Sequence, residues 1–413
     1  MTTLSSVCDI VDCEHRTAPT VPNGYPLIRT PDIDVGRLRV ESAQRVDEAT
    51  YQAWTKRAVP QEGELILARE APVGNVGIIR PGVHPVLGQR TVLIRPRREV
   101  LDPYYLNYLL SGPELRGWMN GVSIGATVPH LNVADIRSME LPVLPPLPTQ
   151  RKIAAILCAY DDLIENNDRR IELLDAIAER TYREWFVYLR YPGHGDDSLS
   201  HSELARVPDG WFIRNLGAFF TVVLGGTPSR KVARYWENGT VPWINSGRVN
   251  QLRVIEPSEL ISEEALASSS AKLMPKGTTL LAITGATLGQ VSMLEIAACA
   301  NQSVVGVYDP SDRHTEFLYL SIRHSIKRII GAASGGAQQH INQQVVRETD
   351  IRIPTPELAD RFRAIVRPIF EAIAFLLRTQ LCLNASRELL LPRLVSGEID
   401  VAELNIRLSQ PTL

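Results

Sequence analysis

The sequence predicts an α+β protein made of two tandem, strand-rich mixed domains, each followed by a long helix. Three observations lead to this prediction. The chain has 413 residues, more than one ordinary hydrophobic core requires. Two segments of the first half recur in the same order in the second half. Two long segments also carry apolar residues at the spacing of paired helices, so we expect these helices to form an antiparallel coiled coil.

The internal repeat lies about 210 to 215 residues apart. Residues 63–79 read GELILAREAPVGNVGII and parallel residues 277–294, which read GTTLLAITGATLGQVSML. Residues 125–132 read GATVPHLN and parallel residues 335–342, which read GGAQQHIN. Each copy then passes through a proline-punctuated stretch into a long helical segment. Because matching landmarks in one order are improbable by chance, we infer a duplication.

Within each copy, short apolar runs alternate with Gly and Pro turns, which is typical of strands. The clearest runs are Leu65–Ala68, Val76–Ile79 and Thr91–Ile94. A helix is predicted to start after Asp102 and to cover DPYYLNYLLSGPELRGWMN, because Asp is a good N-cap and Pro103 suits the first helical position. We therefore expect strand-rich domains with peripheral helices.

The first long helix is predicted from Thr149 to about Tyr188, a stretch without Gly or Pro. Its apolar residues alternate steps of three and four, which predicts a heptad seam. Asn167 falls on this seam, where it is either buried and fixes the register or half exposed. The predicted seam residues are Ile153, Ile156, Tyr160, Leu163, Asn167, Leu174 and Ile177.

The second long helix is predicted to begin at Thr355–Pro356 and to stop near Pro392 and Gly397. Pro368 should kink it or mark its true start, so this helix is expected to be shorter or broken. Two seams that cannot be satisfied alone most simply pack on each other, as a strut of about 45 to 60 Å. In the alternative, each helix only caps its own domain. The predicted seam residues are Ile369, Ile373, Leu376, Leu383, Leu390 and Leu394.

These segments divide the chain into five parts. The predicted parts are a first domain at 1–148, a long helix at 149–190, a second domain at 195–354, a second long helix at 355–400 and a C-terminal tail at 401–413.

The composition is that of an ordinary globular protein, with 44% apolar and 22% charged residues, which excludes collagen-like, disordered and membrane classes. No apolar run approaches the roughly 20 residues that span a bilayer, and the first residues do not resemble a signal peptide. We therefore expect a cytoplasmic protein. Cys8, Cys13 and His15 lie close together, but no second ligand pair follows, so no metal site is predicted.

The charges nearly cancel, with 44 Lys and Arg against 46 Asp and Glu, so the net charge does not indicate nucleic-acid binding. Their distribution is more informative. Residues 29–45, 90–98 and 323–328 are mostly basic, whereas carboxylates gather in 161–184. Such a separation suits a protein with basic faces for phosphates and other faces for protein partners, although part of it is ordinary solvated surface.

Three segments resemble the specificity subunits of type I restriction-modification enzymes. Residues 145–187, PPLPTQRKIAAILCAYDDLIENNDRRIELLDAIAERTYREWFV, are similar to the central conserved helix of that family. Residues 387–401, RELLLPRLVSGEIDV, are similar to its distal conserved region. Residues 207–229, VPDGWFIRNLGAFFTVVLGGTPS, with YWENGTVPWINSG after them, look like the opening of a second target-recognition domain. The second helix departs from the first in Pro368 and in lacking the Gln150–Arg151 pair.

The resemblance implies a division of labour. Each recognition domain would read one half of a split site in double-stranded DNA, and the helices would set the gap between the halves. Two methyltransferase subunits would dock on the helices, and a translocating restriction subunit would join them. S-adenosylmethionine, ATP and magnesium would belong to those partners, with no cofactor in this chain.

Candidate DNA-binding residues are polar side chains beside the repeat landmarks, where loops would reach base edges. His130 and His340 are shared by both copies, so they are expected to hold the frame or contact phosphate rather than read different bases. Gln338 and Gln339 differ from the other copy, and amides suit adenine edges. The full set is His15, Arg16, Arg69, Arg90, His130 and Asn132 in the first domain, and Arg230, Lys231, Ser246, Gln302, Gln338, Gln339 and His340 in the second.

No catalytic motif stands out. Asp102-Pro103-Tyr104-Tyr105 superficially resembles a motif of amino-methyltransferases, but no Gly-rich cofactor turn precedes it and a helix start explains it. The Gly225–Pro228 stretch lacks the Lys of a phosphate loop. We therefore expect a non-catalytic DNA-recognition subunit. The alternatives are a self-contained methyltransferase or nuclease, and a helical scaffold that binds only protein.

Overall fold

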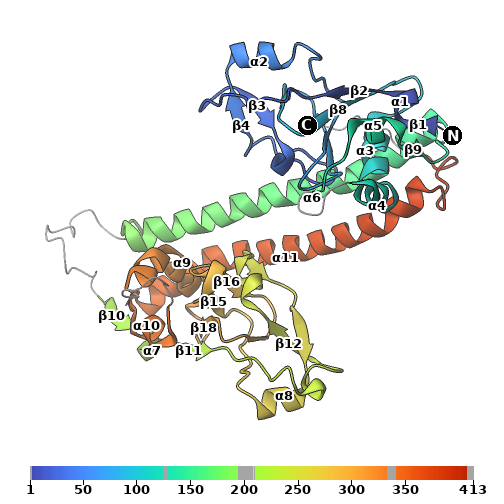
Figure 1. Ribbon diagram of the computed structural model, residues 1–413. Helices are drawn as coiled ribbons and strands as arrows, with labels where there is room; N and C mark the ends of the chain where they lie inside the picture. The colour runs from blue at the N-terminus through green and yellow to red at the C-terminus, as the bar shows by residue number, and fades with distance from the viewer. Residues whose placement is uncertain (1, 124–128, 194–207, 209, 333–340, 407–413) are drawn as a thin grey trace. The chain divides into compact units, whose positions relative to one another are not determined.

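The computed structural model describes residues 2–123, 129–193, 208, 210–332 and 341–406. It is a mixed α/β structure with small sheets and two long helices, α6 and α11 (Figure 1). Contacts divide the chain into two compact units. Unit 1 comprises Met1–Glu165 with Cys382–Leu413, and unit 2 comprises Asn166–Leu381. The boundary falls inside both long helices, so each unit contains part of each.

Unit 1 is built on one four-stranded antiparallel sheet and one three-stranded sheet. The larger sheet has the order β2-β8-β5-β6, at Cys8–Asp12, Thr91–Pro96, Leu65–Ala68 and Val76–Ile78. The smaller has the order β4-β3-β7, at Gln44–Val46, Tyr25–Ile28 and Val86–Leu87, and β1 (Thr2–Thr3) pairs with β9 (Glu140–Leu141). The three strands predicted from apolar runs are confirmed as β5, β6 and β8.

The helices of unit 1 lie mostly between these strands in sequence. The predicted N-cap is confirmed, since the Asp102 carboxylate accepts hydrogen bonds from the backbone N–H groups of Tyr104 and Tyr105, both at 3.0 Å. The prediction of one helix after Asp102 is wrong, because the chain breaks at Gly112, where Pro113 disfavours a helical residue before it. The helices are α1 (Leu4–Val7), α2 (Glu48–Trp54), α3 (Pro103–Ser111), α4 (Pro113–Val122), α5 (Val133–Ser138) and the 3₁₀ turn η1 (Thr30–Asp32).

Unit 2 has a five-stranded and a three-stranded sheet. The larger has the order β11-β18-β15-β16-β13, at Thr221–Leu224, Val304–Tyr308, Thr279–Ala282, Val291–Leu294 and Arg253–Val254. The smaller has the order β14-β12-β17, at Glu259–Ile261, Val241–Ile244 and Cys299–Ala300, and β10 (Phe212–Asn215) pairs with β19 (Asp350–Ile353). The helices are α7 (Leu216–Phe219), α8 (Glu263–Ser268), α9 (Thr315–Ala332) and α10 (Gln343–Glu348), with 3₁₀ turns η4 (Ala233–Tyr235), η5 (Ser246–Asn250) and η6 (Gly285–Thr287).

The two units repeat one order of strands. The series β2-β8-β5-β6 of unit 1 recurs as β11-β18-β15-β16 in unit 2, and β4-β3-β7 recurs as β14-β12-β17. The repeat extends to the register, because Leu67 faces Val76 in unit 1 and Leu281 faces Val291 in unit 2. The similarity between residues 63–79 and 277–294 is therefore also a similarity of hairpins.

Gly74 and Gly289 occupy equivalent turns of these hairpins. Their φ angles are +77° and +82°, a left-handed region that side chains other than Gly adopt rarely. A Cβ at Gly74 would also lie 3.2 Å from Met119, and one at Gly289 would lie 2.4 Å from Ile330. Both the turn and the close approach of a helix therefore require glycine.

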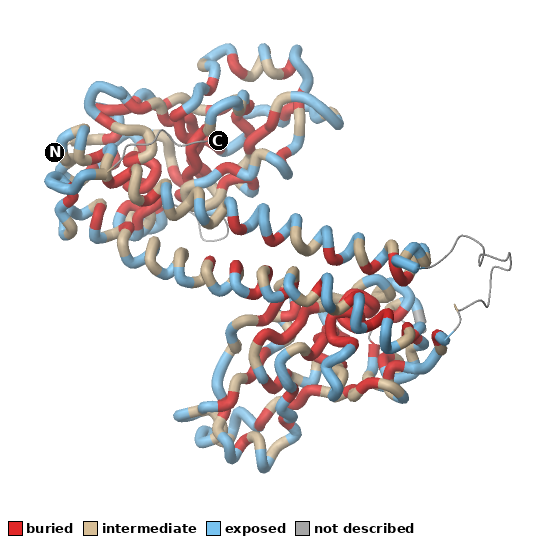
Figure 2. Tube along the Cα trace, turned by 180° about the vertical axis from the view of Figure 1, so that it is seen from behind, coloured by how far each residue is buried: buried red, intermediate tan, exposed pale blue. Residues whose placement is uncertain are grey.

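Each unit has its own buried core, and each core includes the end of a long helix (Figure 2). Leu391 and Leu394 near the end of α11 join the core of unit 1. Tyr182 at the end of α6 and Phe186 just after it join the core of unit 2. The alternative in which each helix caps only the domain before it is therefore wrong.

The second long helix is continuous. α6 spans Leu147–Tyr182 and is followed by a π-helical turn, η2, at Arg183–Val187, whereas α11 spans Pro356–Val395. The expectation that Pro368 shortens or breaks the second helix is wrong. A proline inside a helix costs about 3 kcal/mol through a lost hydrogen bond and a steric clash. Pro368 itself is exposed, and its neighbours Val366 and Phe370 are buried in the core of unit 2, so packing offsets that cost.

Within each unit, α6 and α11 contact each other at a few positions. Within unit 2, Ile171 packs with Ile373 and Leu376, and Gln380 Nε2 donates to Asp168 Oδ1 at 2.6 Å. Within unit 1, Arg387 Nε lies 2.7 Å from Asp161 Oδ1. In unit 2 the partners run in opposite directions along the two helices, because Ile171 meets Ile373 while the earlier Asp168 meets the later Gln380. All six residues predicted for the seam on α11 are buried or half-buried: Ile369, Ile373, Leu376, Leu383, Leu390 and Leu394.

Two predicted α6 seam residues are exposed. Leu163 and Ile177 are more than half exposed, so the prediction that they belong to the seam is wrong. The positions seven residues apart from Ile153 are buried or half-buried, and Asn167 is one of the buried ones. Between these positions, Leu157, Ile171 and Ala178 are buried. Each lies one residue after the row formed by Ile156 and the positions that follow it at intervals of seven. Spacing alone cannot distinguish these phases when both rows are apolar.

Candidate functional site

The edge of the larger sheet of unit 1 at which β2 and β5 end and β8 begins gathers three of the six residues predicted for this unit, Arg69, Arg90 and His130. β2 ends at Asp12, β5 is followed by Arg69 and Glu70, and β8 is preceded by Arg90. Because β2, β8 and β5 are antiparallel neighbours, the ends of β2 and β5 meet the start of β8. Four charged side chains are thereby brought to one edge.

Arg69 is the buried centre of this cluster. Its Nε donates to the carbonyl oxygen of Leu131 at 2.9 Å, and its Nη1 donates to Asp12 Oδ1 at 3.2 Å. Its Nη2 lies 3.0 Å from Nε2 of His130. With the side chain only 10% exposed and three partners engaged, Arg69 joins β2, β5 and the segment before α5. This residue is held in the frame rather than presented to solvent.

His130 and Arg90 continue the network outward. A guanidinium can only donate, so His130 Nε2 accepts from Arg69, and His130 Nδ1 donates to Glu70 Oε1 at 3.0 Å. Glu70 Oε2 also pairs with Arg90 Nη1 at 2.5 Å. The Arg90 side chain is 62% exposed, and an exposed pair of this kind contributes only about 0 to 1 kcal/mol. Arg90 can therefore exchange its carboxylate for a phosphate at little cost.

The other predicted residues of unit 1 surround this network. His15 is exposed and its Nε2 lies 3.1 Å from Asp12 Oδ2. The Arg16 guanidinium lies over the Trp54 ring, 4.7 Å from its centroid. Asn132 precedes α5, and its Nδ2 donates to Asp135 Oδ2 at 3.1 Å.

In unit 2 the predicted residues lie on loops around β11, β12 and β17. Arg230 donates to both carboxylate oxygens of Glu259 at 2.7 and 2.6 Å and stacks on Trp236, 3.4 Å from the ring centroid. The hydrogen bond to Glu259 raises the pKa of Arg230, and the same contact holds the pKa of Glu259 below its ordinary value. Lys231 is exposed, and Ser246 is the half-buried first residue of η5.

Gln302 lies in the turn between β17 and β18. The Thr227 hydroxyl donates to Gln302 Oε1 at 2.5 Å, which orients the amide. Three further predicted residues, Gln338, Gln339 and His340, lie outside the described residues.

Gln89 occupies in unit 1 the place of Gln302 in unit 2, although it is not among the residues predicted from the sequence. Gly88 N donates to Ile28 O at 2.8 Å, just as Asn301 N donates to Ile244 O at 3.0 Å. Each glutamine is the exposed residue that follows in the turn. A signal was available, since LGQRTVLI at 87–94 parallels ANQSVVGV at 300–307.

The residues on either side of the two glutamines differ. Arg90 O accepts from Arg69 N at 2.8 Å and Ser303 O accepts from Ile283 N at 2.9 Å, so Arg90 and Ser303 are equivalent. The registers of β2 with β8 and of β11 with β18 likewise make His15 equivalent to Thr227. One frame thus presents a common glutamine beside different neighbours.

The described part of the chain has neither a metal-binding cluster nor a helix that could span a membrane. It contains no group of three or more His, Cys, Asp or Glu side chains placed to hold a metal ion. Cys8 is buried, and burial raises the pKa of its thiol to about 12. No helix among the described residues is long and apolar enough to span a bilayer.

Comparison with known proteins identifies the class. The family described as type I restriction modification DNA specificity domain matches the chain over residues 3–176 and again over residues 208–365. The chain therefore belongs to this family. It is 27% identical over 367 residues to the type I restriction enzyme MjaIX specificity subunit of Methanocaldococcus jannaschii, covering 87% of this chain and 83% of that one.

Two further similarities agree with this assignment. The HindI specificity subunit of Haemophilus influenzae is 25% identical over 375 residues, covering 76% of this chain and 81% of that one. The crystal structure of a type I restriction-modification S subunit from M. genitalium superposes with a TM-score of 0.63 at 16% identity, covering 95% of both chains. The latter likeness shows a shared fold.

Proposed function

We propose that this chain is a non-catalytic specificity subunit in which each unit reads one half of a bipartite DNA site. The observation that carries the proposal is the repeated sheet edge. The frame and one glutamine recur, whereas His15 and Arg90 of unit 1 are replaced by Thr227 and Ser303 in unit 2. Base sequence is read by side chains that reach groove edges, so a constant frame with different neighbours suits two different half-sites.

The recognition domains are proposed to span residues 1–148 and 195–354, separated by the long helices at 149–190 and 355–400, with a tail at 401–413. The helices would pair as an antiparallel coiled coil that fixes the gap between half-sites.

Two methyltransferase subunits are proposed to dock on the long helices. Large apolar side chains that the fold leaves 47 to 70% exposed support a protein-binding surface there. They are Leu163, Leu173 and Ile177 on α6, and Ile365, Phe375 and Leu389 on α11. A translocating restriction subunit would join the assembly in the cytoplasm. S-adenosylmethionine would be bound by the methyltransferase subunits, and ATP and magnesium by the restriction subunit.

The proposal is tested by purifying the chain with its methyltransferase subunits and footprinting the complex on DNA. We expect two subunits per chain, two protected patches separated by a fixed gap, and methyl transfer only when the partners are present. Methyl transfer by the chain alone would instead indicate a self-contained enzyme. A stable complex that protects no DNA would indicate a protein-only scaffold.

Gln89→Ala and Gln302→Ala should each weaken DNA binding by about two- to thirteenfold, the effect of one hydrogen bond worth roughly 0.5 to 1.5 kcal/mol. In unit 2 the Thr227 hydroxyl occupies Gln302 Oε1, which leaves the amide NH₂ to donate to DNA. Because both copies carry the glutamine, the loss should be equal on cognate and altered half-sites.

The measurement is equilibrium binding of the methyltransferase complex to duplexes with either half-site changed. Gln61→Ala is the matched control, since Gln61 is an exposed glutamine before the opposite end of β5. A selective loss of preference at one base pair would assign the glutamines to base reading instead.

A further inference from the structure

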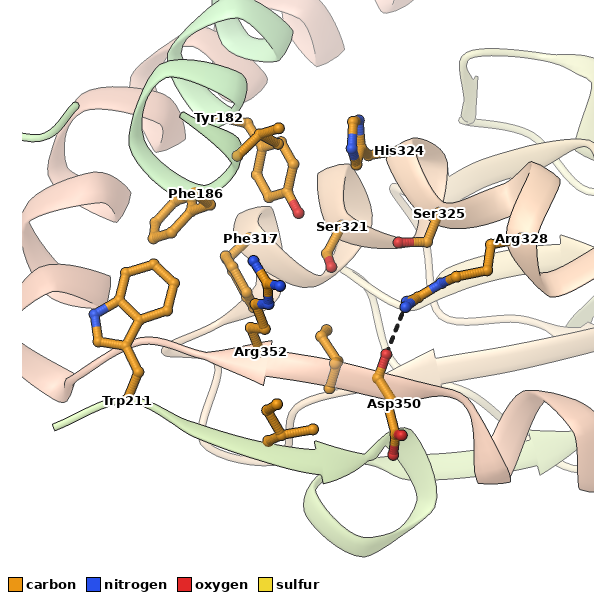
Figure 3. A pocket seen from close by; sticks show the side chains of 13 residues that line it. Tyr182, Phe186, Trp211, Phe317, Ser321, His324, Ser325, Arg328, Asp350 and Arg352 are labelled. Carbon is orange, nitrogen blue, oxygen red and sulfur yellow. Dashed lines mark hydrogen bonds between the residues drawn. The ribbon is translucent and has the colours of Figure 1, made fainter. Parts of the chain in front are cut away.

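Unit 2 contains a pocket of about 460 Å³ that none of the predicted DNA-binding residues lines. Three elements enclose it: the end of α6 with η2, one face of α9, and the ribbon of β10 and β19 (Figure 3). Its size is within the range of small-molecule sites in proteins. It is therefore a cavity separate from the sheet edge described above.

One wall of the pocket is aromatic. Phe186 meets Phe317 edge to face at 4.8 Å between ring centroids, and Trp211 lies 5.7 Å from Phe186. Tyr182 adds a fourth ring, 5.9 Å from Phe317. All four side chains are buried, so they form a fixed surface against which a planar ring can pack.

The wall of the pocket formed by α9 is polar beyond Phe317. Phe317, Ser321, Ser325 and Arg328 recur every three or four residues, so they share one face of the helix. Ser321 and Ser325 supply hydroxyl groups, and His324 lies beside them (Figure 3). This wall can donate to and accept from the edge of a heterocycle.

The phenol of Tyr182 is a further donor in this pocket. Burial raises its pKa to about 12, although the Ser321 hydroxyl and the charges of Arg328 and Arg352 act in the opposite direction. The group is therefore protonated at neutral pH. Figure 3 shows its hydroxyl directed toward the polar wall.

Among the described residues, neither arginine of the pocket is paired with a carboxylate. Arg328 Nη2 donates to the backbone carbonyl of Asp350 at 2.9 Å. Within the described part of the chain, the Arg352 guanidinium has neither a hydrogen bond nor an ion pair. By contrast, Arg367 binds Asp312 and Glu316, and Arg323 binds Asp175.

Asp350 borders the pocket with its backbone carbonyl, and Figure 3 shows its carboxylate directed away from Arg328, so the two guanidinium groups make this part of the lining positive. A site that combines guanidinium groups with aromatic rings selects a ligand with an anionic group attached to a flat ring.

We propose that this pocket binds a nucleoside monophosphate, with the base against Tyr182, Phe186 and Phe317 and the phosphate at Arg328 and Arg352. The hydroxyls of Ser321 and Ser325 would contact the base or sugar. Such a group comes either from a free nucleotide or from a terminal nucleotide of a DNA strand. The proposal does not depend on how the chain reads its half-sites, because the pocket shares no residue with that edge.

Isothermal titration of the full chain with AMP, adenosine and inorganic phosphate tests this proposal. AMP should bind once per chain, at least tenfold more tightly than adenosine or phosphate alone, because only AMP engages both walls. The variant Arg328→Ala/Arg352→Ala should weaken AMP binding at least tenfold. Arg214→Ala, at an exposed arginine of β10 outside the pocket, should leave it unchanged.

A short single-stranded oligonucleotide with a 5′-phosphate separates the two sources. Competition with AMP that is abolished in the double variant would assign the site to a DNA end, whereas AMP binding without such competition would assign it to a free nucleotide. Circular dichroism and thermal unfolding of each variant check that it is folded. Binding of neither probe at millimolar concentration, equal binding by the folded double variant, or tighter binding of an acidic peptide ending in phenylalanine would overturn the proposal.

Discussion

Replacing Arg69 with alanine is expected to destabilise unit 1 by about 3 kcal/mol, because it removes three hydrogen bonds of a buried guanidinium, each worth roughly 0.5 to 1.5 kcal/mol. The change would deprive Asp12 Oδ1, the Leu131 carbonyl and His130 Nε2 of the donors that they now share. These groups come from three separate parts of the chain. Their loss should loosen the sheet edge at which the first half-site is proposed to be read.

Hydrogen exchange of the full chain measures this effect locally. Amides in β2, β5 and β8 should exchange roughly 100-fold faster in Arg69→Ala, since each 1.4 kcal/mol is a factor of ten, while amides of unit 2 should be unaffected. Arg39→Ala is the matched control, because Arg39 also pairs with an aspartate, Asp34, but on the surface. If both variants changed exchange equally, Arg69 would be an ordinary surface cation and its central role in the edge would be wrong.

Local patterns in the sequence predict much of the frame. Strands β5, β6 and β8 follow from short apolar runs, and the start of α3 follows from Asp102 and Pro103. These features depend on the backbone conformations that residues close together in sequence prefer. The internal repeat extends the prediction to the second unit, because equivalent turns require the same residue type. Gly74 and Gly289 are an example, since both have a positive φ angle.

Long-range contacts account for what the sequence does not disclose. Arg69 and His130 were selected as polar residues beside landmarks, but their mutual hydrogen bond joins positions 61 residues apart, which no local pattern reveals. The predicted seam of α6 is wrong at Leu163 and Ile177 for a related reason. Ile156 and Leu157 are both apolar neighbours, and only the packing of each unit decides which of the two rows is buried.

Gln89 is a different case, because its signal was present in the sequence. The parallel of LGQRTVLI with ANQSVVGV is short and contains few identities, so it gains weight only once backbone hydrogen bonds align the two turns. The equivalence of Gln89 and Gln302 thus rests on geometry.

Lengthening both long helices should change the gap between half-sites without changing the half-sites. The proposed coiled coil would set that gap, so we consider four residues inserted after Glu165 in α6 and four after Leu381 in α11. Four residues add about 6 Å and slightly more than one helical turn, which keeps the buried stripe close to its original face. At about 3.4 Å per base pair, the preferred gap should grow by one or two base pairs.

The outcome is measured by mapping methylated positions in DNA treated with the assembled complex. Seven inserted residues, about 10 Å, should preserve the seven-residue repeat of buried positions and add about three base pairs. Insertion at the open turn of Gly82, where a side chain would meet no atom within 4 Å, is the control that should leave the gap unchanged. A changed half-site with an unaltered gap would contradict the spacer role. A gap that grows in proportion to helix length would separate the two tasks physically, because the sheet edges would then choose the bases and the helices would choose the distance between them.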